Sequence, residues 1–195
     1  MSSLSAYFKA RLLDGTLQPD FSSLHTGFPG TTGANEVTGG SYARQSIAFA
    51  VSAGGIRAQI GAEVFSVPAS STVRWVGYWQ AGNWLFAVPA GGAAPKNFVS
   101  LSSSDMVYSP AHGWSDGQKV VFFNGTPPGG LAEGSVVFVR DALTDSFKIA
   151  ATLGGPAIDL TAPPSAGCWI AAITEYVYSA AGSFNLETSQ IVIPD

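Results

Sequence analysis

The chain has 195 residues, a formal net charge of −4 and 11% charged side chains, whereas 46% of its residues are hydrophobic. This apolar content is enough for a folded core, so the composition excludes a disordered chain. Nine basic residues against thirteen acidic ones exclude a general nucleic-acid-binding protein, because phosphate contacts need a surplus of Lys and Arg.

The cysteine count and the hydropathy pattern exclude further classes. Cys168 is the single cysteine, which excludes an intramolecular disulfide framework and a cysteine-rich zinc site. There is no apolar run of the ~18 residues that a membrane-spanning helix needs, and charges interrupt the N-terminal stretch where a signal peptide would lie. We therefore expect cytoplasmic folding without membrane insertion. The sparse charge favours assembly with other copies or partners.

The N-terminal segment is the one part of the chain with helical periodicity. Apolar and aromatic residues between Leu4 and Leu12 recur near a 3.6-residue period, and Gly15 can end the helix. The pattern predicts a short helix over about residues 3–14. Residues 15–46 are rich in turn formers, above all in Gly27–Asn35, and predict loops.

Strand-like segments dominate the rest of the chain. In the first half we predict strands over residues 42–51, 56–60, 63–67, 72–79 and 84–88. After a stretch of small and polar residues at 89–104, we predict strands over 119–123, 135–140, 146–150, 173–178 and 190–193. In the strand predicted over residues 42–51, Ile47, Phe49 and Val51 share one face.

The many short strands with Gly and Pro between them predict an all-β protein, a sandwich or barrel behind a short N-terminal helix. The change in composition near residue 104 predicts two domains. The main domain is expected to comprise residues 1–104 plus 167–195. A smaller β module is expected to be inserted at residues 105–166.

The segment Leu24–Gln45 (LHTGFPGTTGANEVTGGSYARQ) resembles a family of tailed-bacteriophage virion proteins usually described as tail fibre or minor tail proteins. Leu12-Leu13-Asp14 and Thr72–Trp79 are similar to further segments of that family, so the resemblance covers roughly residues 4–90. In this reading GANEVTGG is a turn-rich loop whose glycines take positive φ. Tyr42 and Arg44 would hold loop carbonyls by side-chain hydrogen bonds.

The inserted module carries a resemblance of its own. The module is similar to a small β repeat found in phage tail and fibre proteins. Four segments carry this similarity: Ala111–Val120, Gly130–Gly134, Asp145–Ile149 and Gly154–Thr161. Both resemblances imply a virion protein made in the cytoplasm of the bacterial host. Neither implies a catalytic motif.

The chemistry-bearing residues predict no catalytic, cofactor or metal site. The sequence lacks a G-x-S-x-G nucleophile elbow, a calcium loop, a P-loop and a dinucleotide fingerprint. Its carboxylates are scattered, with Asp141 and Asp145 together in one loop. We expect His25 to bond within the loop that follows it and His112 to be a turn residue.

The aromatic residues are the candidates for an interaction surface. Trp75, Tyr78, Trp79 and Trp84 lie in one strand–turn–strand region, where they either pack in the core or form an exposed cluster. Trp114 lies in a turn region and is expected to be exposed.

Together, these expectations predict a non-enzymatic structural protein of a tailed phage virion, associated with the tail fibre or baseplate. Its partners would be other virion proteins and further copies of itself, for example as a trimer. One alternative is a decoration protein of the capsid surface. A second alternative is a module that binds a host receptor or glycan.

Overall fold

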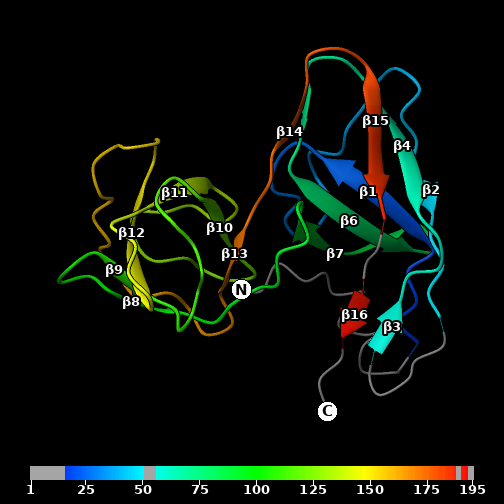
Figure 1. The fold of residues 1–195 in the computed structure, drawn as a ribbon. Helices are drawn as coiled ribbons and strands as arrows, with labels where there is room; N and C mark the ends of the chain where they lie inside the picture. The colour runs from blue at the N-terminus through cyan, green and yellow to red at the C-terminus, as the bar shows by residue number, and fades with distance from the viewer. Residues whose placement is uncertain (1–15, 51–55, 188–189, 193–195) are drawn as a thin grey trace. The chain divides into compact units, whose positions relative to one another are not determined.

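The computed structural model describes residues 16–50, 56–187 and 190–192, and within these ranges the chain forms strands and no helix (Figure 1). The all-β prediction is therefore confirmed. The helix predicted over residues 3–14 lies outside the described residues, as does Val51 of the first predicted strand.

The chain forms two compact units, and the second is inserted into the first. The main unit comprises Leu4–Val88 and Glu175–Asp195, and the inserted unit comprises Pro89–Thr174. The divisions lie at 88/89 and 174/175, not at the expected 104/105 and 166/167. The difference arises because the strands on both sides of the expected module pair with strands inside it, as described below.

A four-stranded sheet forms the centre of the main unit, in the order β2-β1-β6-β7. Its strands are β1 (Phe21–His25), β2 (Gln45–Ser46), β6 (Trp75–Gln80) and β7 (Asn83–Pro89). β1 runs antiparallel to β6, with Phe21 opposite Trp79 and His25 opposite Trp75. Loops and short strands cover both faces of β6, which is why its residues from Trp75 to Trp79 are all buried.

Three antiparallel strand pairs complete the main unit. They are β14 (Tyr176–Tyr178) with β5 (Ser71–Val73), β15 (Gly182–Leu186) with β4 (Glu63–Val67), and β16 (Gln190–Val192) with β3 (Ile56–Ala58). The C-terminal segment thus returns to the main unit through all three pairs. Arg74 fixes this return, because its guanidinium binds the carboxylate of Glu175 and donates to the Thr26 carbonyl at 2.7 Å.

Several predictions for the main unit differ from the structure, and the strand predicted over 72–79 is divided at Arg74 into β5 and β6. Residues 21–25 form β1 although the segment was assigned to loops, because its two serines are buried in the sheet and conceal the strand pattern. The long strand predicted over 42–51 is reduced to β2, and Ile47 and Phe49 still pack into the core beyond it. The strand predicted over 63–67 matches β4.

The inserted unit is a six-stranded antiparallel sheet in the order β13-β10-β11-β12-β9-β8. Its strands are β8 (Val99–Leu101), β9 (Met106–Tyr108), β10 (Lys119–Phe123), β11 (Val136–Arg140), β12 (Ser146–Ala150) and β13 (Trp169–Ala172). Lys96, just before β8, exchanges two backbone hydrogen bonds with Ile170 of β13. This bridge joins the two ends of the sheet into a small barrel.

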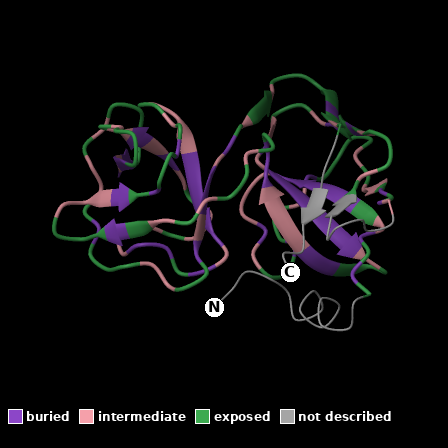
Figure 2. Cartoon of the chain, turned by 60° about the horizontal axis from the view of Figure 1, so that its bottom comes forward, coloured by how far each residue is buried: buried purple, intermediate pink, exposed green. Residues whose placement is uncertain are grey.

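The core of the inserted unit lies inside this barrel. It is built from apolar side chains that alternate along the strands, among them Val120, Phe122, Phe147, Ile149 and Ile170. Figure 2 shows buried residues along the strands and exposed residues mainly in the connections. The predicted strands at 119–123 and 146–150 match β10 and β12, whereas β8, β9 and β13 were not predicted.

Candidate functional site

A chain of hydrogen bonds between buried side chains crosses the main sheet. The indole Nε1–H of Trp79 donates to Ser23 Oγ at 2.7 Å, and Ser23 Oγ lies 2.8 Å from His25 Nε2. The other ring nitrogen, His25 Nδ1, lies 2.7 Å from the carbonyl oxygen of Ala34. Since a carbonyl only accepts, Nδ1 carries the proton, and Ser23 donates to Nε2. The expected bond between His25 and the loop after it is confirmed.

The Ser23–His25 pair has the geometry of a nucleophile and its base, but it lacks access to a substrate. Both side chains are fully buried. Burial lowers the pKa of His25 below its ordinary value of 6.5, so the ring is neutral near pH 7. A nucleophile needs a reacting atom beside it, and here the surrounding space is occupied by indole rings. The pair therefore holds the loop against the sheet.

Two glycines make room for this cluster. A Cβ atom on Gly77 would lie 2.4 Å from His25 Nε2 and 2.6 Å from Ser23 Oγ. A Cβ atom on Gly33 would lie 2.7 Å from atoms of both Trp79 and Trp84, and Gly33 also has a φ of +78°. Only glycine fits at either position without movement of the rings.

The GANEVTGGSYARQ segment is held through the carboxylate of Glu36. Arg44 binds this carboxylate with contacts of 2.8 to 3.2 Å, and the Tyr42 hydroxyl donates to it at 3.2 Å. Tyr42 also accepts the backbone N–H of Leu24 at 2.8 Å, and the Arg44 guanidinium stacks 3.4 Å from the ring centre of Trp79. Tyr42 and Arg44 thus hold the loop through Glu36, and not through loop carbonyls as expected.

The four clustered aromatic candidates are core residues. Trp75, Tyr78, Trp79 and Trp84 are all buried, and Trp79 and Trp84 meet edge to face at 5.0 Å. Their rings are therefore not presented as a surface by this chain, and the packing alternative describes them. Sequence spacing could not decide this, because both faces of β6 are covered.

Trp114 is half-buried, whereas we expected it to be exposed. Its ring packs against Phe147 and His112, with centroids 5.5 Å from each. His112 is buried beside the turn in which it was expected, and its Nε2 lies 2.7 Å from the Leu143 carbonyl oxygen. Both residues thus pack loop segments against Phe147 in the core of the inserted unit.

The loop carboxylates also have structural partners. Asp116 accepts the N–H of Ala142 at 2.8 Å, and Asp145 accepts the N–H of Ala111 at 2.8 Å. Within the described ranges no three His, Cys, Asp or Glu residues gather where they could hold a metal ion. The same ranges contain no helix long and apolar enough to cross a membrane.

The β8–β9 hairpin carries an exposed apolar face, which sequence reasoning missed. Val99 lies opposite Tyr108 and Leu101 lies opposite Met106, so these four side chains share one face of the ladder. Val99 is 60% exposed and Leu101 is 48% exposed. The opposite face, with Ser100 and Val107, is buried. The alternation Val-Ser-Leu, which predicts a half-buried strand, was the signal available in the sequence.

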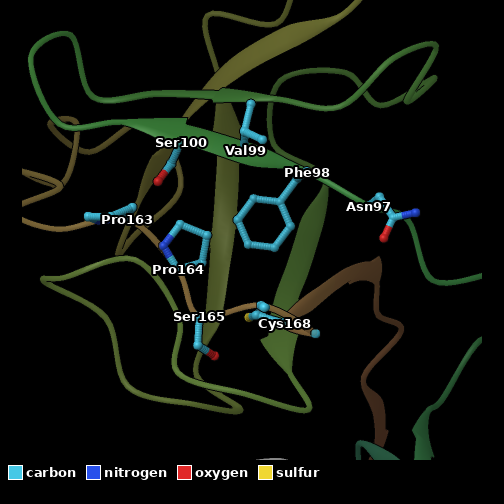
Figure 3. Close-up of a pocket in the computed structure, with 10 residues that line it drawn as sticks. Asn97, Phe98, Val99, Ser100, Pro163, Pro164, Ser165 and Cys168 are labelled. Carbon is cyan, nitrogen blue, oxygen red and sulfur yellow. The ribbon is translucent and has the colours of Figure 1, made fainter.

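A pocket of about 300 Å³ lies beside this hairpin. Asn97–Ser100 form one wall, and Pro163–Cys168 form the other (Figure 3). Neither wall contains an Asp, Glu, Lys, Arg or His residue, and burial raises the pKa of the Cys168 thiol to about 11, so the thiol is neutral. The pocket therefore suits uncharged groups.

Comparison of the chain with models of known families, with curated proteins and with solved structures finds no match.

Proposed function

We propose that the chain is a non-enzymatic structural subunit of a tailed phage virion, associated with the tail fibre or baseplate, and that it works by binding other subunits. The observation that carries this proposal is the apolar face of the β8–β9 hairpin. Four apolar side chains stand in cross-strand pairs on one exposed face, which is an arrangement suited to contact with protein. The virion assignment rests on the resemblance of Leu24–Gln45 and of the module segments.

The arrangement of the chemistry-bearing residues supports a binding role. The Ser23–His25 pair is inaccessible, and the loop carboxylates accept backbone N–H groups in turns. Burial of Trp75, Tyr78, Trp79 and Trp84 also disfavours the glycan-binding alternative, because sugar binding usually needs an accessible aromatic face.

The proposed position of the chain in the virion is tested by quantitative mass spectrometry of purified phage particles. The copy number of the chain is expressed relative to the major capsid protein. We expect a small number of copies in multiples of three or six, as in a tail fibre or baseplate. Hundreds of copies would replace this location with the capsid surface. Absence from purified particles would overturn the virion assignment.

A further inference from the structure

On the side of β8 that faces away from β9, the backbone groups have no hydrogen-bond partner among the described residues. Lys96 directs its N–H and C=O toward Ile170, at 2.7 and 3.1 Å. Backbone groups alternate sides along an extended chain, so those of Phe98 and Ser100 point the same way. The carbonyl of Asn97 points toward β9 instead, where it accepts Ser109 Oγ–H at 2.9 Å. In the described sheet order, β9 is the one neighbour of β8.

The barrel does not close beyond the Lys96–Ile170 bridge. Cys168 would be the next ladder partner of Phe98, but its N–H donates to the Ser165 carbonyl at 3.2 Å and closes a turn. The pocket separates β8 from residues 163–168 at this point (Figure 3). β8 is therefore an open strand edge along Phe98–Leu101.

Ser100 gives a second, independent sign that this edge is incomplete. The residue is 8% exposed, and its Oγ is buried with no hydrogen-bond partner in the described part of the chain. In Figure 3 the hydroxyl lies on the side of β8 that faces Pro163 and Pro164. Because a buried hydroxyl without a partner is unfavourable, this atom is expected to acquire one in the assembled state.

The sequence around Ser100 is complementary to itself. We propose that β8 pairs antiparallel with β8 of a second copy of this chain, about a twofold axis that passes through Ser100. This register places Ser100 opposite Ser100 of the partner subunit, so that each hydroxyl gains a partner. Val99 then lies opposite the partner subunit's Leu101, which extends the apolar outer face across the interface.

The absence of charge along the edge favours this occupant. Edge strands of monomeric proteins are commonly protected by charged residues or proline. Asn97–Leu101 contains neither, and Val99 and Leu101 are exposed beside the open edge. A twofold pair needs no complementary charges, because both strands present the same neutral surface. The inference goes beyond the proposed function and concerns only how two copies meet.

Sedimentation of the full-length chain tests the pairing between about 1 µM and about 1 mM, a range that covers weak interfaces. We expect the mass to rise from one chain to two as concentration increases. Val99→Lys should weaken this association at least ~10-fold, because it places two charges beside the twofold axis. Val64→Lys is the matched control, since Val64 is also an exposed strand valine, at 57%, and lies in the main unit.

Ser100→Ala is the second variant, because it removes the proposed hydroxyl contact and leaves the backbone unchanged. It should weaken association less than Val99→Lys does. The proposal would be overturned if Val99→Lys and Val64→Lys changed the association constant equally. It would also be overturned by a wild-type chain that stays single at every concentration. Particle mass spectrometry is independent of these results, so the virion assignment and the pairing can fail separately.

Discussion

One buried polar cluster in the main unit differs from the buried polar groups at the edge of the inserted unit. In the main unit, Ser23, His25 and Trp79 satisfy one another in the centre of a sheet. In the inserted unit, His112 bonds to a loop carbonyl, and Ser100 has a buried hydroxyl without a partner among the described residues at the edge of the barrel. A network that is complete within one chain specifies a fold, whereas an incomplete group at an edge is available to a partner.

This difference separates the recognisable motif from the candidate interface. The GANEVTGGSYARQ segment supplies Glu36, Tyr42 and Arg44, whose contacts stay within the main unit. The candidate interface lies in a serine-rich stretch, Val99–Tyr108, that carries no motif. The contacts of the segment with the most specific resemblance thus serve folding, whereas the exposed apolar face is the surface that we propose for binding.

The largest expected effect is on the apolar core of the inserted unit. Phe147→Ala should lower the free energy of unfolding of this unit by about 3–5 kcal/mol, because it leaves a cavity among fully buried side chains. Calorimetry that separates the transitions of the two units measures the change. Leu153→Ala is the control at a 70% exposed position, where the effect should stay within about 0.5 kcal/mol. Equal effects would contradict the assigned core.

The next effect tests the close packing of the main unit. Gly77→Ala should destabilise this unit by about 3 kcal/mol, because the new Cβ would displace His25 or Ser23. Gly82→Ala is the control, since a Cβ there meets nothing and only the φ of +77° opposes it, at about 1 kcal/mol. Denaturant titration followed by NMR of both units measures the change. A Gly77→Ala effect no larger than that of the control would exclude the described cluster.

A smaller effect is expected at Glu36. Glu36→Gln should destabilise the main unit by about 1–2 kcal/mol, since Arg44 loses a charged partner that is only partly shielded from water. Glu187→Gln is the control at an exposed carboxylate and should have little effect. Chemical denaturation of both variants gives the comparison. If Glu36→Gln left the free energy of unfolding unchanged, packing alone would hold the loop.

The smallest effect is a pH dependence confined to the main unit. The pKa of His25 is lowered in the folded state, so the unfolded chain binds more protons below pH 6.5. Stability from this residue is present above pH 6.5 and is lost as pH falls, by at most about 1.4 kcal/mol per pH unit. Unfolding of wild type and His25→Gln between pH 5 and 7 measures it. The variant should show the shallower slope, and equal slopes would assign the titration elsewhere.

Much of the fold could be predicted from residue patterns. β4, β10 and β12 match their predicted bounds because each is a short run rich in apolar residues that turn residues flank. β1 was missed because Ser22 and Ser23 resemble loop residues, although neighbouring strands supply the burial that makes them part of a sheet. The domain boundaries were misplaced because pairing over long sequence separations, such as Lys96 with Ile170, leaves no local pattern.

The candidate surface was harder to predict. Spacing placed Trp75 and Trp79 on one face, but it could not show that loops cover that face. The exposed face of β8 and β9 depends on which side of a short hairpin meets the barrel core. That choice is made by tertiary packing, and three-residue strands carry too little periodicity to predict it.

Hydrogen exchange of the backbone amides, measured at low and high protein concentration, tests most directly whether the inserted unit completes its open edge with a second copy. We predict that the amides of Phe98 and Ser100 exchange more slowly at high concentration, while those of the β1–β6 ladder are unchanged. Unchanged exchange at Phe98 and Ser100, in a sample shown to be dimeric, would contradict this interface.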